Sequence, residues 1–444
     1  YSRGTSRVFW HKLPSGTEFM YPAGCFIETD SVMKFGVFYE HQIPRPWNAT
    51  SEYEHFQNAL TQVEIADQCG YDYAWQVEHH FLEEYSHGSS PTAFLAAASQ
   101  RTKNIRLGHG VFQLTTNHPI RIAEQVANLD LLSGGRVDLG TGEGAGPTEL
   151  HPFGARVREK RDIYEEGFRA MLPCFTSTDY GFEGKYWQWP RRNVLPKPLQ
   201  LPHPPLWVAC SNINTIMYAA KRGIGALGFQ FATPEGAKAW VHKYYNIISS
   251  DAVEKLCDYE LNPNIAIVSG FMCAETDEEA RAKAEGWTFF VFCLEYNGTH
   301  TYEPGTVNLW EEYQTWRQSG KAQKTFETGL IGSPDTIRRK LREFEASGID
   351  QIILLNQSGK TSHHDICESL QLFAREVMPE FHERDAEHQE WKRAVMAKEI
   401  ELEDIDLKDH KRLAVMDAMS QEGRHRPSQE EIAAKMAAKE KTAV

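Results

Sequence analysis

Short apolar segments alternate with amphipathic segments along most of this chain. Eight segments are apolar almost throughout, as parallel strands covered on both faces should be: residues 33–40, 73–77, 105–113, 136–142, 205–211, 224–231, 265–273 and 349–356. Between them, apolar residues recur every three or four positions and predict helices: residues 52–69, 91–100, 119–132, 159–175, 215–222, 234–249 and 335–347. This alternation predicts an α/β protein, a (β/α)8 TIM barrel. A doubly wound sheet is the alternative, but no GxGxxG motif follows the first strand to favour it.

The predicted barrel takes up residues 33–381. Three regions of the chain depart from the alternation of strands and helices. Residues 1–32 have no period and predict an N-terminal extension. Residues 286–328 are rich in Trp, Tyr and Phe and too long for an ordinary loop; connections of this length usually carry function or are disordered. Residues 382–444 are rich in Glu, Lys, Ala and Arg and predict a charged, solvated helical tail. A helix that packs on a partner subunit is the alternative for this tail.

The charge of the chain limits its partners. The formal net charge is −14, which argues against a nucleic acid or an anionic membrane as partner, because both need a basic surface. The eight cysteines include no CxxC pair, so we expect neither a disulfide scaffold nor a zinc ribbon. No apolar run approaches the roughly 20 residues of a membrane helix, and the first residues lack a secretory pattern. A cytoplasmic protein is therefore expected.

The stretch VEHHF (77–81) places chemistry at the end of the second predicted strand. Functional groups of a barrel lie at the carboxyl ends of its strands, where Glu78, His79 and His80 would stand. Neighbouring residues of an extended chain point to opposite sides, and no second ligand set such as HExxH follows, so we expect no metal site. A histidine facing the pocket could serve as base or hydrogen-bond donor, because its pKa lies near 6.5. The alternative to a catalytic role is that both histidines are structural residues with satisfied hydrogen bonds.

Two further strand ends could approach a ligand. GTGEGAG (140–146) ends the fourth strand and permits close approach to the backbone, or simply forms a tight turn. It lacks the Lys-Ser/Thr of a P-loop, so it is a weak phosphate signal. CSNINT (210–215) ends the fifth strand and opens a helix with Ser and Asn at capping positions. Free N–H groups there would suit a phosphate, and simple capping fits the stretch equally well.

These segments together resemble the bacterial luciferase-like family of flavin-dependent monooxygenases, from residue 33 to about 381. The closest stretches are MKFGVF, VEHHF, NHPIRIAEQVANLDLLSGGRVDLGTGEG, HPFG, GSPDTIRRKLREFEASGIDQI and LFAREVMPEF. Their shared order and spacing make the set specific. The resemblance implies a barrel with an aromatic insertion near the seventh strand. It also implies reduced FMN supplied by a separate flavin reductase, reaction with O2, and a homodimer or higher homo-oligomer.

The resemblance also implies roles for residues at the strand ends. His79 matches the histidine that the luciferase alpha chain uses as catalytic base, and His80 is its neighbour in the motif. Phe112 and Gln113 match the strand end beside the isoalloxazine ring. The flavin phosphate would lie at the start of the helix that follows the fifth strand, held by a group of four residues: Cys210, Ser211, Asn214 and Thr215.

The sequence departs from luciferase where the flavin would bind. The reactive cysteine of luciferase is Gly142 here, and a phosphate-linked arginine is Glu143. Light emission with a long aldehyde is therefore not implied, and the phosphate is left short of one cation. Arg121, Arg136 and Lys360 are candidates to replace it, and nothing in the sequence selects among them.

The expected reaction is oxygenation through a C4a-peroxyflavin, which survives only where water is excluded. The insertion 286–328 could close as a lid over such a site, and His79 would manage the proton. Aromatic residues near strand ends suggest a small apolar organic substrate, although barrel packing is the more common role of each one taken alone: Trp75, Phe81, Phe229 and Phe231. The alternatives are an F420-dependent oxidoreductase of the same fold and a non-catalytic flavin-binding or partner subunit.

Overall fold

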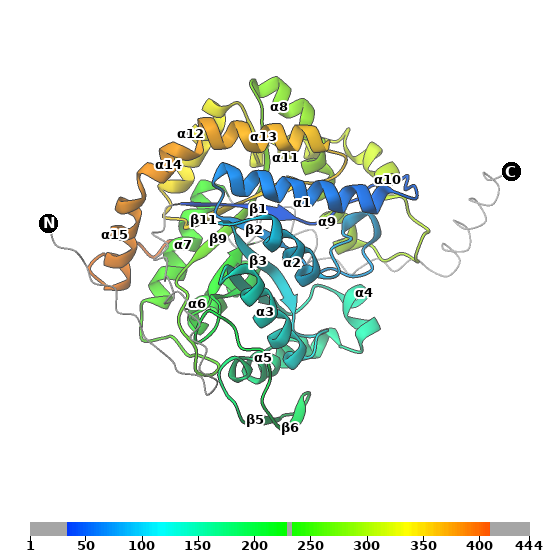
Figure 1. Cartoon of the computed structure of the whole chain (residues 1–444). Coiled ribbons are helices and arrows are strands. Elements are labelled where there is room, and N and C mark those ends of the chain that lie inside the picture. The colour runs from blue at the N-terminus through cyan, green and yellow to red at the C-terminus, as the bar shows by residue number, and fades with distance from the viewer. Residues whose placement is uncertain (1–32, 229–232, 409–444) are drawn as a thin grey trace, which may run out of the picture.

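Eight parallel strands close into a barrel, as the sequence predicts. The protein is described from a computed structural model (Figure 1), over residues 33–228 and 233–408. The pairing of β8 with β9 closes the ring. In chain order the strands are β1 (Lys34–Tyr39), β2 (Tyr73–Gln76), β3 (Arg106–Gln113), β4 (Val137–Gly142), β7 (Leu206–Cys210), β8 (Gly225–Gly228), β9 (Ile265–Cys273) and β11 (Gln351–Gln357). A short strand, β10 (Leu330–Gly332), pairs with the end of β9 outside this ring.

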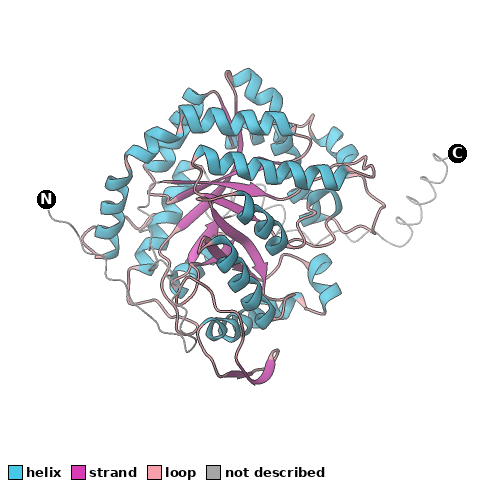
Figure 2. Cartoon of the chain, viewed as in Figure 1, coloured by secondary structure: helices cyan, strands magenta, loops and turns pink. Residues whose placement is uncertain are grey.

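Helices surround the strands (Figure 2). All seven predicted helices are present, and an eighth follows β11: α1 (Ser51–Cys69), α2 (Pro91–Arg101), α3 (Pro119–Ser133), α5 (Lys160–Met171), α6 (Ile213–Arg222), α7 (Pro234–Ile248), α12 (Pro334–Glu345) and α13 (His363–Glu376). Local signals fix their ends. The side chain of Asn212 caps the start of α6, and Gly223 ends this helix with a φ of 69°, a conformation that glycine adopts without a steric penalty.

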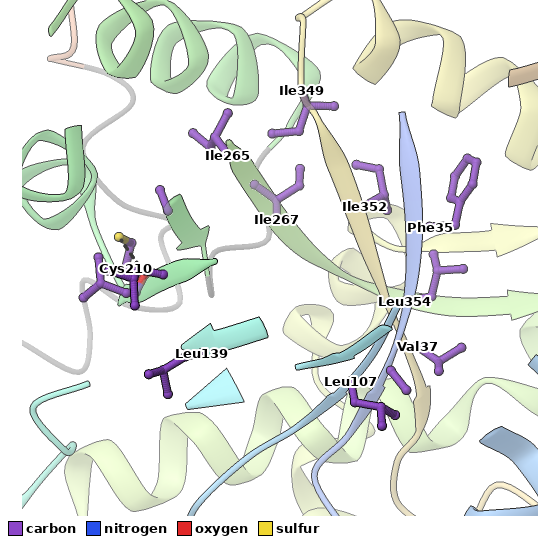
Figure 3. Close-up of a cluster of buried hydrophobic side chains, with 14 of the residues drawn as sticks. Phe35, Val37, Leu107, Leu139, Cys210, Ile265, Ile267, Ile349, Ile352 and Leu354 are labelled. Carbon is purple, nitrogen blue, oxygen red and sulfur yellow. Dashed lines mark hydrogen bonds between the residues drawn. The ribbon is translucent and has the colours of Figure 1, made fainter. Parts of the chain in front are cut away.

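Alternate strand residues point outward and form the core against these helices (Figure 3). Phe35 and Val37 of β1 and Ile352 and Leu354 of β11 belong to this outer layer, and none of the four is more than 1% exposed. Such strands need apolar residues on both faces, which explains their continuous apolar pattern.

The barrel interior is filled by large rings that lie over glycines. A Cβ on Gly108 would stand 2.1 Å from Cε3 of Trp75, and one on Gly225 would stand 2.6 Å from Trp207. The Trp207 indole N–H donates to Asp138 at 2.9 Å. Trp75, for which the sequence suggests a substrate contact, is therefore an interior packing residue.

The predicted insertion is helical and packs on the barrel. It consists of α9 (Glu285–Thr299), α10 (Leu309–Trp316) and α11 (Gly320–Thr328), and α8 (Asp277–Lys283) precedes it. Trp287 of α9 lies over Gly270 of β9, where a Cβ would be 2.1 Å from the indole, and its N–H donates to the carbonyl of Thr325 at 2.9 Å. The aromatic residues that single out this segment in the sequence therefore belong to the same hydrophobic cluster as the side chains of the barrel interior.

Several further short elements complete the described structure. They are η1 (Glu83–Tyr85), α4 (Pro147–Leu150), η2 (His151–Phe153), η3 (Val157–Glu159), η4 (Leu172–Phe175), the hairpin β5 (Tyr180–Glu183) and β6 (Gln188–Arg192), α14 (Met378–Glu383) and α15 (Asp385–Met396). The hairpin has a long-range anchor. The buried carboxylate of Glu166 accepts the backbone N–H groups of residues 185–187 at 2.7–2.9 Å.

Up to Lys408 the C-terminal segment packs on the barrel of the same chain, which differs from the expected solvated tail. Trp391 of α15 contacts the ring of Tyr245 at 5.5 Å, and Lys392 pairs with the buried Asp350 at 3.0 Å. These buried contacts explain why the segment does not stay in solvent. Residues 1–32, 229–232 and 409–444 lie outside the described residues, and with them Phe229 and Phe231. Within the described ranges, no helix is both long and apolar enough to span a bilayer.

Candidate functional site

The carboxyl ends of the strands meet at one end of the barrel, which we call the mouth. Glu40 follows β1, His79 follows β2, Gln113 ends β3, Gly142 ends β4 and Ser211 follows β7. Because parallel strands present all their carboxyl ends on one side, the fold brings these five residues to the same face. The described chain therefore has a polar mouth over a hydrophobic interior.

The ring of His79 lies between two carboxyl groups. Its Nδ1 is 2.9 Å from Oε1 of Glu149, and its Nε2 is 3.3 Å from Oε1 of Glu40. The ring of Tyr85 meets it edge to face at 5.6 Å. Burial disfavours the charged ring, but Glu149 and Glu40 outweigh this effect and raise the pKa of His79 to about 9.

Different groups hold His80. Its Nε2 is 2.9 Å from Oε1 of Glu78, an oxygen that also accepts a hydrogen bond from the Asn117 amide at 2.7 Å. The ring of Phe153 covers His80 at 4.8 Å. The two neighbouring histidines therefore have separate partners, as the alternation of an extended chain requires. Phe81, the next residue, is 56% exposed.

Glu149 links three segments of the mouth, although the sequence pattern did not indicate it. Its Oε1 accepts hydrogen bonds from the His79 ring at 2.9 Å, the backbone N–H of His80 at 3.0 Å and the Gln113 amide at 3.2 Å. The residue stands on α4, a single turn in the loop after β4. The signal available in the sequence was an acidic residue in a Gly- and Pro-rich loop at a strand end.

A bulge in β3 decides which of its last side chains reaches the mouth. His109 pairs with Leu139 but Phe112 pairs with Thr141, so β3 has one extra residue, and such bulges re-aim side chains. Phe112 consequently stacks on His109 at 4.5 Å within the outer core. Because the side chain of Phe112 lies in this outer core, only its main chain could contact a ligand at the mouth. Val111, which the pattern missed, packs against the inner cluster instead.

Gln113 and Gly142 lie opposite each other at the ends of β3 and β4. The Gln113 amide donates to the carbonyl of Glu78 at 2.8 Å, whereas its buried Oε1 has no partner within the described residues. A Cβ on Gly142 would stand 2.6 Å from Cγ2 of Val111. A cysteine in place of Gly142, as in luciferase, would therefore require Val111 to move.

Two cations that the sequence reasoning missed stand beside Glu143. Arg161 of α5 pairs with its Oε1 at 2.6 Å, and Lys160 lies 3.9 Å from its Oε2. The Arg161 guanidinium also lies 4.2 Å from the ring centre of Tyr218 on α6. This contact places a positive charge between the loop after β4 and helix α6.

The start of α6 is capped by its own residues. The side chain of Asn212 accepts the N–H groups of Asn214 and Thr215, and the Thr215 hydroxyl accepts the N–H of Asn212 at 3.2 Å. Cys210 is buried, and its thiol faces the carbonyl of Thr215 at 3.3 Å. Ser211 is exposed at the strand end. The four predicted phosphate residues are therefore adjacent, but the capping box already uses two of the helix N–H groups.

Each of the three cations proposed from the sequence has another contact. Arg136 donates to the carbonyls of Ile105 and Ser99 at 2.7 and 2.9 Å, at the end of the barrel opposite the mouth. Arg121 pairs with Glu124 on the exposed face of α3. Lys360 lies 4.2 Å from the ring centre of Trp310. Arg161 and Lys160 also have a partner, but that partner is Glu143, which occupies the position of the missing arginine, so these two are the better candidates for the missing charge.

The loop that carries the histidines also holds the insertion. The buried carboxylate of Glu84 accepts the N–H groups of Leu309 and Trp310, at the start of α10, at 2.7 and 3.1 Å. It also accepts the N–H of Arg45 at 2.9 Å. We call this contact the Glu84 anchor. Next to it, Tyr85 stacks on Phe290 of α9 at 5.7 Å, so an aromatic wall borders the mouth.

The donor set at the mouth could hold a phosphate and a ring system. A helix start, Ser211 and two basic side chains offer hydrogen bonds and charge to a phosphate, and the unpartnered Oε1 of Gln113 can accept an N–H from a ring system. Within the described residues, the group of three potential metal ligands is His364, Asp365 and Glu368. None of these belongs to the predicted site, and Lys283 already pairs with Asp365 and Glu368.

Comparison with known proteins gives a consistent result. The sequence model described as luciferase-like monooxygenase matches residues 33–351. The oxygenase component of flavin-dependent trigonelline monooxygenase from Acinetobacter baylyi is 26% identical over 79% of this chain and 96% of its own length. The alkanal monooxygenase alpha chain of Photobacterium leiognathi is 25% identical over 71% of this chain and 90% of its own.

Solved structures share the fold. A monooxygenase from Streptomyces bottropensis superposes with a TM-score of 0.65 at 25% identity, covering 79% of this chain and all of its own. The oxygenating constituent of 3,6-diketocamphane monooxygenase from Pseudomonas putida, solved with FMN, gives 0.61 at 22% identity over 78% and 98%. An F420-dependent tetrahydromethanopterin reductase from Methanopyrus kandleri gives 0.58 at 20% identity over 79% and 100%.

Proposed function

Because this chain belongs to the luciferase-like monooxygenase family, we propose that it is the oxygenase component of a two-component enzyme. It would take reduced FMN from a separate flavin reductase and use O2 to oxygenate a small apolar organic substrate. The observation that carries the proposal is the position of His79, which stands at the barrel mouth between two carboxyl groups. The similarity to the oxygenase component of trigonelline monooxygenase supports the two-component arrangement.

The mouth residues divide into a phosphate side and a ring side. Ser211, the start of α6, Arg161 and Lys160 would hold the phosphate, with the two cations offsetting the negative charge of Glu143. Gln113 and Gly142 would lie beside the isoalloxazine ring. Bound FMN in its reduced form supplies the electrons that activate O2. The residues of the chain bind the ring system, exclude water and manage the proton.

Helices α9 and α10 would act as the lid of this site. The Glu84 anchor fixes the start of α10 to the histidine loop, and the stacked pair of Tyr85 and Phe290 gives the mouth an apolar wall. Dry surroundings protect reactive oxygen chemistry from water. A cytoplasmic homodimer remains our expectation for the assembly and location of the protein.

The test compares two cofactors under two atmospheres. The purified protein would be given reduced FMN under 18O2 with a panel of aldehydes, cyclic ketones, terpenes and aromatics, and products would be read by mass spectrometry. We expect one labelled oxygen atom in the product, and a loss of at least about 100-fold in turnover for His79→Gln with FMN binding retained. Unchanged turnover in this variant would favour a non-catalytic flavin-binding subunit.

An F420-dependent oxidoreductase is the second candidate, because a protein of that kind shares the fold. This activity transfers hydride and needs no O2. Tight binding of F420 and substrate-dependent change of its absorbance under argon, without label incorporation under 18O2, would support it over the FMN-dependent reaction.

A further inference from the structure

His79 is enclosed by negative groups from several elements. The side chains of Glu40 and Glu149, which contact its two nitrogens, are each only 2% exposed. Glu78, next to it in the chain, adds a third carboxylate, and the hydroxyl of Tyr85 and the thiol of Cys293 on α9 also face Glu40. Within the described residues, neither Glu40 nor Glu149 has an ion pair with a lysine or arginine.

Burial of two carboxylates without a cation is costly, because each loses its hydration. A positive charge on the ring of His79 compensates both at once, and both nitrogens then carry the protons that such contacts need. Oε1 of Glu149 accepts three hydrogen bonds. Glu40 is different, because its Oε1 is buried and has no hydrogen-bond partner within the described residues, although Nε2 of His79 is 3.3 Å away.

We infer that His79 is an imidazolium at neutral pH, positioned by Glu40 and Glu149, and that the proton which the site exchanges near neutral pH leaves from Glu40. The ring would then stabilise negative charge and donate hydrogen bonds, rather than act as the free base that the resemblance implies. Glu40 and Glu149 are positioning residues in this assignment. Their part in catalysis rests on the proposed function, whereas the protonation states do not.

The direction of the pKa shifts agrees with this geometry. Burial raises the pKa of Glu40 to about 7, with the field of His79 lowering it and that of Glu149 raising it. For Glu149 burial also acts to raise the pKa, but His79 and the hydrogen bonds outweigh it, so that the pKa is lowered. As the pH rises, Glu149 therefore loses its proton first, Glu40 loses its proton near neutral pH, and the ring of His79 loses its proton only at alkaline pH.

The experiment titrates the ring by NMR in the flavin-free protein, labelled with 15N-histidine and assigned with His79→Gln and His80→Gln. We expect both His79 nitrogens to remain protonated at pH 7.5. Glu149→Gln and Glu40→Gln should each lower the midpoint of the His79 titration by about one pH unit or more, the usual effect of losing a carboxylate at this distance. Glu78→Gln is the matched control: Glu78 acts on His79 without contacting its ring, so its loss should lower the midpoint of the His79 titration by less than either of the other two changes.

Two results would overturn the inference. One is a His79 ring that titrates near pH 6.5 in the unchanged protein; the other is a His79 midpoint that is the same in Glu40→Gln and Glu149→Gln as in the unchanged protein. Folding of each variant is checked by circular dichroism, and Glu40→Gln alone decides the matter if Glu149→Gln does not fold. None of these readouts needs turnover, so the inference can fail while the monooxygenase proposal stands. In turnover assays, the rate change near pH 7 should disappear in Glu40→Gln and persist in Glu78→Gln.

Discussion

The Glu84 anchor offers a quantitative test of how the insertion is attached to the histidine loop. The Glu84 side chain is fully buried, and its two oxygens accept the N–H groups of Arg45, Leu309 and Trp310. Glu84→Gln keeps the shape but replaces one acceptor by an NH2 donor. One backbone N–H then faces a donor, and an unsatisfied buried group of this kind costs about 1–3 kcal/mol.

Two further effects of Glu84→Gln nearly cancel. The ion pair with Arg45, whose Nε lies 3.3 Å away, is lost. Removal of the charge recovers part of a burial cost, which is visible in the raised pKa of Glu84. We therefore expect a net loss of about 2 kcal/mol. If this loss of stability affects only the local opening of the Glu84 anchor, the N–H groups of Leu309 and Trp310 should exchange with solvent roughly 30-fold faster.

Hydrogen exchange followed by mass spectrometry measures this on peptides that cover 303–312, with peptides of β3 and β4 as internal reference. Glu83→Gln is the matched control. Glu83 also reaches Arg45 and the N–H of Gly305, but it is partly exposed, so its loss should cost less than about 1 kcal/mol. Equal exchange in Glu84→Gln and the unchanged protein, or an increase spread evenly over the barrel, would refute the reasoning.

Three further predictions concern charge, acid and packing. Arg161→Ala should weaken FMN binding about tenfold while leaving riboflavin, which lacks the phosphate, unaffected in fluorescence titrations; an equal loss for both ligands would contradict a phosphate contact. Burial lowers the pKa of His55 from 6.5 to about 4. Between these two pH values His55 is protonated in the unfolded chain and neutral in the folded chain. Stability against urea should fall between pH 6.5 and 4 by up to about 1 kcal/mol per pH unit, and His55→Gln should flatten this slope. Gly108→Ala places a methyl group 2.1 Å from Trp75 and should lower the free energy of unfolding by about 1–3 kcal/mol, whereas Gly320→Ala, which meets nothing within 4 Å, should be neutral.

The sequence by itself determined the barrel and the position of its most informative histidine. The apolar strands and amphipathic helices were predicted correctly because burial on both faces of a strand, or on one face of a helix, leaves a period in the local sequence. The place of His79 at the mouth followed from the same alternation, since a residue just past a strand must lie at its carboxyl end. The expected family was confirmed because the quoted motifs keep one order over most of the chain.

Only the tertiary structure decided which groups surround that histidine. Glu40 and Glu149 lie 39 residues before and 70 residues after His79 and carry no periodic signal; closure of the barrel is what brings their carboxyl groups to its two nitrogens. The extra residue in β3 likewise exchanged the places of Val111 and Phe112, because a bulge reverses the alternation beyond it. Periodicity records which face of an element is buried, whereas the charge state of a side chain depends on neighbours that are distant in sequence and meet only when the chain is folded.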